Sequence, residues 1–295
     1  MDATHLLLVN PHSAGGRALK LLPQVERELE RQAIPYRLTR TRSLEHGVSE
    51  ALRAADAGEI PVVMSGDGLV GQIGGALATS GRAMGIVPGG RGNDLARVLG
   101  IPADPRGAVG VLAAGHVREI DVGEANGRRF LGIASCGFDS EANRIANEAR
   151  LIRGNLVYAY AALRALATWK DARFTITLDG VETIDLVGHS VVVANNKAYG
   201  GGMFIAPGAE LDDGEFDVVL MGKASKLHFL VNLPKVFKGT HVENEEVRVL
   251  RASEVVIEAD REFAVYADGD HLTDLPARLE TLKRALRLIA PPSPA

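Results

Sequence analysis

The chain has 295 residues and a formal net charge of −4 at pH 7, with 46% hydrophobic and 24% charged residues. This composition is typical of a globular protein with a substantial core, and the length allows one large domain or two of ordinary size. The charge gives no electrostatic case for a nucleic-acid partner, and the single cysteine, Cys136, excludes an internal disulfide and a cysteine-based zinc site.

An apolar strand is expected at residues 5–9, and a loop of small and polar residues follows it. The loop, Asn10-Pro11-His12-Ser13-Ala14-Gly15-Gly16, precedes a helical pattern. Between a strand and a helix N-terminus, such a loop suits phosphate oxygens through backbone N–H groups and the Ser13 hydroxyl. It lacks the GK[ST] ending of a Walker A loop and the GxGxxG dinucleotide fingerprint. A second strand and helix are expected at residues 36–39 and 44–57.

A strand, a glycine turn and a helix follow one another between Ile60 and Leu77. Apolar residues 60–64 predict a buried strand, Ser65-Gly66-Asp67-Gly68 breaks it, and apolar residues at helical spacing follow. The turn brings backbone N–H groups and a helix N-terminus to the carboxyl end of the strand, which favours an anion site. Because the Asp67 carboxylate would repel a bare phosphate, a Mg²⁺-nucleotide is the natural ligand. An ordinary tight turn is the alternative for this stretch taken alone.

A fourth strand is expected at residues 84–87, and it ends in the loop Pro88-Gly89-Gly90-Arg91-Gly92. Asn93 is the expected N-cap of a short helix that begins with Asp94. Repeated alternation of strand and helix predicts a parallel α/β sheet, whose ligands lie at the carboxyl ends of the strands. Three polar loops at one edge favour a nucleotide or phosphate site over a purely structural role.

From residue 117 onward the pattern becomes that of antiparallel strands. Asn126-Gly127 and Asp179-Gly180 mark two hairpins, the first with a type I′ turn. Short strands at this spacing predict an antiparallel sandwich. Helices are expected to interrupt it at residues 140–169 and 227–237. The other strands are expected at residues 181–186, 190–194, 216–221, 247–250, 255–259 and 263–267.

These patterns divide the chain into two predicted domains. An α/β nucleotide-binding domain is expected over residues 1–118 and a β-sandwich domain over residues 119–276. The tail, residues 277–295, is expected to pack back on the first domain. Its pattern resembles a final pair of strands, 277–282 and 285–289.

Six short motifs follow one another along the chain. They are VNPHSAG at residues 9–15, GDG at 66–68, GIVPGGRGNDLAR at 85–97, CGFD at 136–139, YGGGM with Pro207 and DGEFD at 199–217, and DGD at 268–270. In this order they resemble the soluble diacylglycerol kinase catalytic-domain family, which includes bacterial lipid kinases and the sphingosine and ceramide kinases. The resemblance covers nearly the whole length. Each motif is weak alone, but six in the right order are specific.

The resemblance implies a two-domain kinase that binds ATP and Mg²⁺ in a cleft and receives the lipid headgroup from the β-sandwich side. The implied nucleotide contacts are Asn10, Pro11, Ser13, Ala14, Gly15, Thr41, Gly66, Asp67, Gly68, Leu69, Gln72, Arg91, Gly92, Asn93 and Asp94. The implied ligands of a structural Mg²⁺ are Glu210, Asp213 and Glu215. The implied catalytic residues are Asp67 and the general base, either Asp268 or Asp270. Because Asp268 and Asp270 alternate along a strand-turn, only one of them is expected to point into the cleft.

The chain departs from the family pattern inside these motifs. Ser65 and Leu69 replace the first glycine and the threonine of GGDGT, Gly71-Gln72 replaces an Asn-Glu pair, Arg91 replaces the threonine of GTxND, and Asp270 replaces a glutamate. These changes remove a hydroxyl and an acidic group from the nucleotide side. The guanidinium at position 91 either binds phosphate as a fork or is solvated. We expect the nucleotide contacts to be affected more than the fold, with weak activity or an altered phosphoryl donor as consequences.

The sequence therefore predicts a Mg²⁺- and ATP-dependent lipid kinase that phosphorylates diacylglycerol to phosphatidic acid at a membrane surface. A sphingoid base, ceramide or another amphiphile would use the same machinery, and an NAD kinase or a catalytically silent lipid or nucleotide sensor are the rivals. The chain has no apolar run of membrane-spanning length and no basic leader, so a cytoplasmic protein with peripheral membrane association is expected. No nucleic-acid partner is expected, and a homodimer is left open.

Overall fold

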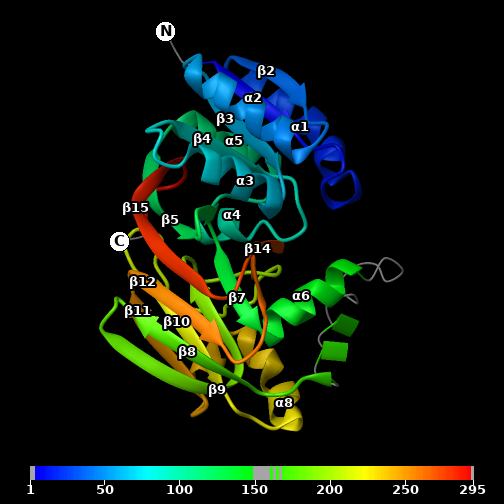
Figure 1. The fold of residues 1–295 in the computed structure, drawn as a ribbon. Coiled ribbons are helices and arrows are strands. Elements are labelled where there is room, and N and C mark those ends of the chain that lie inside the picture. The colour runs from blue at the N-terminus through cyan, green and yellow to red at the C-terminus, as the bar shows by residue number, and fades with distance from the viewer. Residues whose placement is uncertain (1–3, 149–159, 162–163, 166–167, 294–295) are drawn as a thin grey trace.

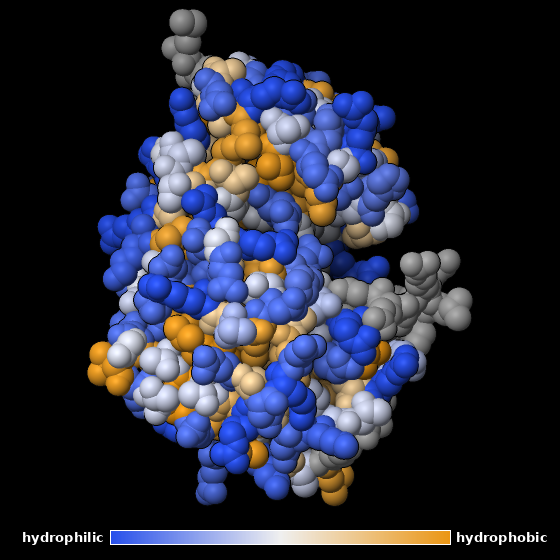
Figure 2. Space-filling model, in the orientation of Figure 1, coloured by the Kyte–Doolittle hydropathy of each residue, from blue (hydrophilic) through white to orange (hydrophobic). Residues whose placement is uncertain are grey.

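The computed structural model describes residues 4–148, 160–161, 164–165 and 168–293. Figure 1 shows two parts, one with helices packed around strands and one built mainly of strands. This arrangement confirms the expected class, a parallel α/β part followed by an antiparallel β-sandwich part. Figure 2 shows that the surface is hollowed between the two parts on one side of the molecule.

Four strands of the first part run parallel, in the order β4-β3-β1-β2. Three of them are buried along nearly their whole length, as expected for strands covered by helices on both faces. The strands are β1 (His5–Val9), β2 (Tyr36–Arg40), β3 (Ile60–Ser65) and β4 (Ala83–Pro88). The helices are α1 (Arg17–Arg31), α2 (Leu44–Asp56), α3 (Asp67–Leu77), α4 (Asp94–Val98) and α5 (Pro105–Ala114), with a 3₁₀ turn, η1 (Ser13–Gly15).

The second part consists of antiparallel strands with helices beside them. The strands are β5 (Val117–Ala125), β6 (Arg128–Phe130), β7 (Ile133–Gly137), β8 (Ala172–Leu178), β9 (Glu182–Ala194), β10 (Phe216–Gly222), β11 (Val247–Ala252), β12 (Glu254–Ala259), β13 (Ala264–Ala267) and β14 (Asp270–Asp274). The helices are α6 (Phe138–Glu148) and α8 (Lys226–Val236), with a 3₁₀ turn, η2 (Thr240–Glu243). The helix expected over residues 140–169 is described through residue 148, and residues 149–159 lie outside the described residues. In the part that the structure describes, no helix has the length and apolarity needed to cross a bilayer.

The strands expected at residues 181–186 and 190–194 are in fact one strand, β9. Gly188 lies between them, and a glycine in that position suggested a break. The glycine instead lets two backbones approach, because a Cβ at Gly188 would overlap the carbonyl oxygen of Met221 on β10.

The tail also forms one strand rather than a pair. β15 (Ala277–Ile289) pairs antiparallel with β5 and β12 and, through its last three residues, parallel with β4. The polar stretch that suggested a turn is a bulge between Leu282 and Leu286, where Arg284 has a φ of 50°. This strand joins the two parts into one continuous sheet of 15 strands.

Asp121 fixes the bulge of β15 to the rest of the sheet. Its side chain is fully buried in β5, and each of its oxygens accepts a short hydrogen bond from a main-chain N–H. The donors are Gly214 and Arg284, both at 2.6 Å. Burial raises the pKa of Asp121, and the two hydrogen bonds oppose that rise by stabilising the carboxylate.

Asp121→Asn should lower the free energy of unfolding by about 2–3 kcal/mol, because the amide NH₂ faces a main-chain N–H and leaves that donor without a partner. Urea unfolding followed by circular dichroism measures the change. Asp56→Asn, at an exposed position of α2, is the control and should change it by less than about 0.5 kcal/mol. Equal stability of the two variants would contradict the role assigned to Asp121.

Candidate active site

Three loops meet where β1, β3 and β4 end. The Ser13 hydroxyl donates to the carbonyl of Gly89 at 3.1 Å, which joins the first loop to the third. Gly66 and Gly90 touch backbone to backbone, since a Cβ at Gly90 would overlap the Cα of Gly66. The Asn93 side chain accepts from the Gly90 N–H at 2.8 Å and donates to the Gly90 carbonyl at 3.1 Å. The structure thus brings together the loops that the sequence singled out.

Asn93 does precede α4, but its side chain does not cap that helix. Asp67, the first residue of α3, provides the acceptor instead, with Oδ1 3.4 Å from the N–H of Leu95. Burial and the nearby Asp94 carboxylate raise the pKa of Asp67. A Cβ at Gly92 would lie 2.9 Å from Asp67 Oδ2 and 3.0 Å from Asp94 Oδ2, so both carboxylates converge on this glycine.

Asp94 links the nucleotide side to the second part of the molecule. Its side chain is buried, and its Oδ2 accepts from the N–H of Gly201, in the YGGGM loop, at 2.8 Å. Its Oδ1 accepts from Arg97 at 3.1 Å, and Arg97 also donates to the Gly92 carbonyl. The Asn-Asp pair of the motif therefore organises three loops.

Two of the implied nucleotide contacts have buried side chains. Leu69 is 2% exposed and packs toward Gly47 on α2, so only its main chain is available to a ligand. Thr41 is 5% exposed, and its N–H and hydroxyl both donate to the carbonyl of Val9. Thr41 thereby holds the end of β1, from which the first loop begins.

The first loop is tightly turned at its middle. Asn10 accepts from the N–H of His12 at 3.0 Å, and its carbonyl accepts from the N–H of Ser13. Ala14 and Gly15 have φ values of 48° and 66°. Pro11 belongs to the same loop. Ser13 connects this loop to the Gly66–Gly90 contact through its hydrogen bond to the carbonyl of Gly89.

Asp268 lies in the turn between β13 and β14 with a φ of 52°. Its carboxylate accepts from three consecutive main-chain N–H groups, those of Leu131, Gly132 and Ile133, at 3.1–3.2 Å. Burial nevertheless raises the pKa of Asp268 to about 6, and the nearby Asp67 contributes to this rise. The Asp268 carboxylate thus accepts its hydrogen bonds from the 131–133 loop and holds that loop in place.

Asp270, two residues further on, has a side chain that is partly exposed and partly covered by the cavity that it lines, with no hydrogen bond or ion pair among the described residues. Its Oδ2 lies 3.7 Å from a Cβ placed on Gly68, so it faces the start of α3. Burial raises the pKa of Asp270, and the positive charge of Arg128 opposes that rise. The expectation that only one of the two acids points into the cleft is not met, because both line the same cavity.

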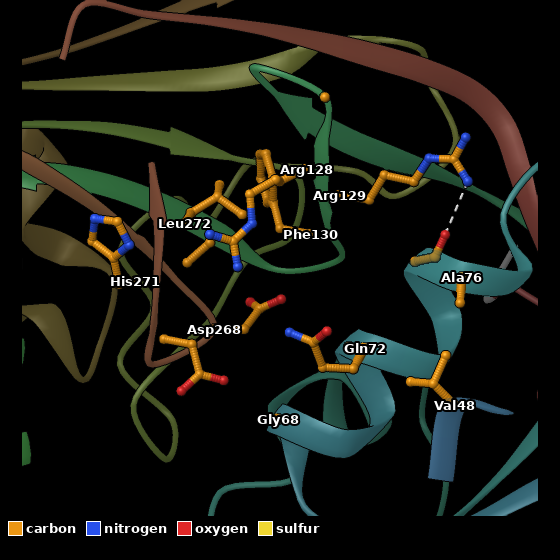
Figure 3. A pocket seen from close by; sticks show the side chains of 15 residues that line it. Val48, Gly68, Gln72, Ala76, Arg128, Arg129, Phe130, Asp268, His271 and Leu272 are labelled. Carbon is orange, nitrogen blue, oxygen red and sulfur yellow. Dashed lines mark hydrogen bonds between the residues drawn. The ribbon is translucent and has the colours of Figure 1, made fainter. Parts of the chain in front are cut away.

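A polar cavity of about 370 Å³ separates α3 from β6 and β14 (Figure 3). Gly68 and Gln72 form one wall, and Arg128 and Asp268 lie opposite. Arg129 holds the two walls together by donating to main-chain carbonyls near the end of α3.

A larger cavity of about 580 Å³ extends from the same place into the second part. Its lining is mainly apolar and includes Val70, Leu131, Phe138, Met203, Ile205 and Met221. Asp67, Arg91 and Asp94 lie at its near end. Gly71 and Asp268 line both cavities, so the polar and the apolar spaces meet there.

One polar pair lies in the wall of the apolar cavity. Tyr199 hydrogen-bonds Asp139 through its hydroxyl, and both residues line the space. The Oδ2 of Asp139 is shielded from solvent and has no hydrogen-bond partner among the residues that the structure describes. Burial raises the pKa of Asp139 to about 6 and that of Tyr199 well above its usual value.

The acids implied as a structural Mg²⁺ site do not form one in the described part of the chain, where no three acidic, histidine or cysteine side chains are grouped to hold a metal. Arg251 on β11 is ion-paired with Asp213 and, at 3.0 Å, with Glu215. Glu210 contributes only a more distant negative charge, felt at Asp217. A guanidinium thus takes the place expected for the ion.

Some residues of the site received no role from the sequence. Arg128 directly follows the Asn126-Gly127 turn, and only the hairpin drew attention to that stretch. Asp121 lies in β5 (VREIDVGEA) among other charged residues, so nothing in the sequence distinguished it. Asp139 and Tyr199 lie in the CGFD and YGGGM motifs, but the motifs alone did not indicate that they meet.

Two sequence families match the chain. The one described as diacylglycerol kinase catalytic domain matches residues 4–125, and the one described as YegS C-terminal NAD kinase beta sandwich-like domain matches residues 132–290. A protein named diacylglycerol kinase from Mycobacterium tuberculosis is 34% identical over 96% of this chain and 94% of its own length. One of the same name from Bacillus subtilis is 26% identical over 97% and 95%. A solved structure of a putative diacylglycerol kinase from Bacillus anthracis has a TM-score of 0.81 at 24% identity, covering 99% of this chain and 98% of that one, which supports the fold.

The raised pKa of Asp139 predicts a pH-dependent stability. Since the folded-state pKa of about 6 exceeds the ordinary value of 3.8, its stabilising contribution is complete below about pH 4 and is lost as the pH rises through 6. The melting temperature of Asp139→Asn should therefore gain on that of the wild type between pH 4 and pH 7.5. Differential scanning fluorimetry measures both curves, with exposed Asp260→Asn as the control. Parallel curves for wild type and Asp139→Asn would refute the assignment.

Proposed function

The chain belongs to the diacylglycerol kinase family and is a lipid kinase, and we propose that it transfers the γ-phosphoryl group of ATP to the free hydroxyl of diacylglycerol. The observation that carries this proposal is that the mainly apolar cavity has Asp67, Arg91 and Asp94 among its lining residues and shares Gly71 and Asp268 with the cavity that Asp270 lines. A nucleotide requires main-chain donors and polar surroundings, whereas an acylated alcohol requires an apolar space. Phosphoryl transfer requires the two substrates to meet at one point beside a proton acceptor.

On the donor side, the three glycine-rich loops support binding of a triphosphate through main-chain N–H groups. The Arg91 guanidinium, beside Asp67 at the near end of the apolar cavity, adds a positive charge for phosphate oxygens. The carboxylates that converge on Gly92 are hard oxygen donors suited to Mg²⁺, so Asp67 and Asp94 would hold an ion that accompanies the nucleotide. The ion would neutralise part of the phosphate charge.

On the acceptor side, the apolar cavity would receive the hydrocarbon part of the lipid and direct its hydroxyl toward Asp268 and Asp270. Asp270 is our candidate general base, because its carboxylate is free while that of Asp268 holds the 131–133 loop. The alcohol oxygen forms a bond to the γ-phosphorus as the bond to the leaving oxygen of ADP breaks. The hydroxyl proton passes to the Asp270 carboxylate.

A sphingoid base or ceramide is the alternative acceptor, and one observation favours it. The unpartnered Oδ2 of Asp139 in the cavity wall would accept a hydrogen bond from an amine or amide, groups that diacylglycerol lacks.

Transfer of radiolabelled phosphate from ATP to lipids in mixed micelles tests the proposal. Diacylglycerol should be labelled faster than sphingosine or ceramide. Faster labelling of sphingosine would favour the alternative, and labelling of NAD with no lipid labelled would replace the lipid kinase by an NAD kinase. ATP binding without transfer to any acceptor would leave a nucleotide sensor.

Asp270→Asn should lower kcat by at least about 100-fold while the KM for ATP stays within about threefold, because the change removes the proton acceptor and little binding surface. Asp268→Asn should instead lower both kcat and the melting temperature, since its NH₂ faces the N–H groups of the 131–133 loop. Steady-state kinetics and thermal melts measure these effects.

Asp274→Asn, at the exposed end of the same strand, is the matched control and should leave kcat within about twofold. A kcat of Asp270→Asn above a tenth of the wild-type value would remove Asp270 from the proton transfer.

A further inference from the structure

The segment of residues 223–238 combines basic and apolar residues. It contains four lysines, Lys223, Lys226, Lys235 and Lys238, and no aspartate or glutamate, in a chain whose net charge is −4. Apolar residues lie between the lysines. Basic segments that are also apolar favour anionic membrane surfaces.

Helix α8 occupies most of this segment and exposes apolar side chains to solvent. Leu227 is 72% exposed, Val231 67% and Phe237, directly after the helix, 54%. Leu227 and Val231 are four residues apart, so they lie on one face of the helix. Figure 1 draws α8 at the lower end of the molecule, and Figure 2 shows hydrophobic surface at that lower edge.

A different face of the same helix lines the apolar cavity. His228, Asn232 and Val236, again at helical spacing, belong to its wall, and Phe237 completes the wall at the end of the helix. The Ser225 hydroxyl accepts from the N–H of His228 and caps the first turn. The helix therefore separates the cavity from solvent, with apolar side chains on its outer face as well.

Three of the lysines in this segment are accessible to a charged surface outside the protein. Lys223, Lys235 and Lys238 are exposed at the two ends of the helix. Their nearest described contacts are weak or neutral: Lys223 is 3.7 Å from Asp171, and Lys235 donates to the amide oxygen of Asn244 at 2.8 Å. A second copy of the chain on this face would bring two sets of lysines together, whereas anionic lipid headgroups would neutralise them.

We propose that α8 is a membrane-docking helix whose Leu227–Val231 face enters an anionic bilayer. The wall that α8 contributes to the apolar cavity then lies at the membrane surface. This inference rests on the proposed function, in that it gives a lipid acceptor a route from the bilayer past Phe237 into the cavity. The partner that it names is a phospholipid surface with net negative charge. The docking itself requires no phosphoryl transfer.

Sedimentation with vesicles tests the docking directly. The wild-type chain should bind vesicles of phosphatidylcholine with phosphatidylglycerol at least tenfold more tightly than vesicles of phosphatidylcholine alone. Leu227→Ser/Val231→Ser should weaken binding to the anionic vesicles about tenfold or more, and Lys235→Gln/Lys238→Gln should do the same while abolishing the preference for anionic lipid.

Two control variants remove an exposed apolar side chain and an exposed lysine at positions outside α8. Val181→Ser changes an 89% exposed apolar residue in the β8–β9 turn, and Lys20→Gln changes an exposed lysine on α1. Both should bind vesicles like the wild type. All variants should phosphorylate a dispersed short-chain diacylglycerol within about twofold of the wild-type rate, because the cavity and the acids are untouched.

Unchanged vesicle binding by both α8 variants, or equal losses in the controls, would overturn the docking proposal even if every variant phosphorylates lipid. Dimerisation that the Leu227→Ser/Val231→Ser variant loses in sedimentation velocity, without vesicle binding, would overturn it in favour of a second copy. Vesicle binding that depends on α8 supports it even in a chain that labels no lipid, an outcome that would refute the kinase proposal alone.

Discussion

The Asp268 carboxylate, held by three consecutive main-chain N–H groups, is the constraint on which the site depends. In the turn from Asp268 to Asp270, Asp268 itself has a positive φ and Gly269 follows with a φ of 92°. Hydrogen bonds to Leu131, Gly132 and Ile133 fix this turn against the loop between β6 and β7. The same carboxylate lies at the junction of the two cavities. One buried charge thus sets where the free carboxylate of Asp270 lies relative to both.

The other requirement is that the two halves of the site keep their relative position. β15 runs through both parts, and Asp121 holds its bulge by two main-chain hydrogen bonds. Asp94 makes the corresponding link at the level of the loops, because it binds Gly201 from the second part while lying beside Asp67. The sheet and the loops therefore align the nucleotide side with the apolar cavity, and no movement between the two parts is required.

The sequence predicted well what depends on local pattern and poorly what depends on distant partners. Apolar runs and glycine loops located β1, β3, β4 and their loops, because burial between helices leaves a local signature. The bulge of β15 was read as a turn, since Lys283-Arg284 interrupts the apolar pattern and only Asp121, more than 160 residues away, reveals that the strand continues. The family resemblance, rather than the local pattern, assigned Asp213 and Glu215 to a metal. Nothing near them in the sequence indicates that Arg251 comes from β11 to neutralise them.

The departures from the family motifs acquire a physical meaning in the folded chain. A hydroxyl at position 69 would face Gly47 in the core, where the buried Leu69 contributes packing instead. Gln72 replaces an acid in the wall of the polar cavity, and Arg128 lies across the cavity from it. Arg91 adds a cation at the near end of the apolar cavity. Each of these changes makes the surroundings of a triphosphate less negative. The chain thus surrounds the same loops with fewer negative charges than the family pattern does.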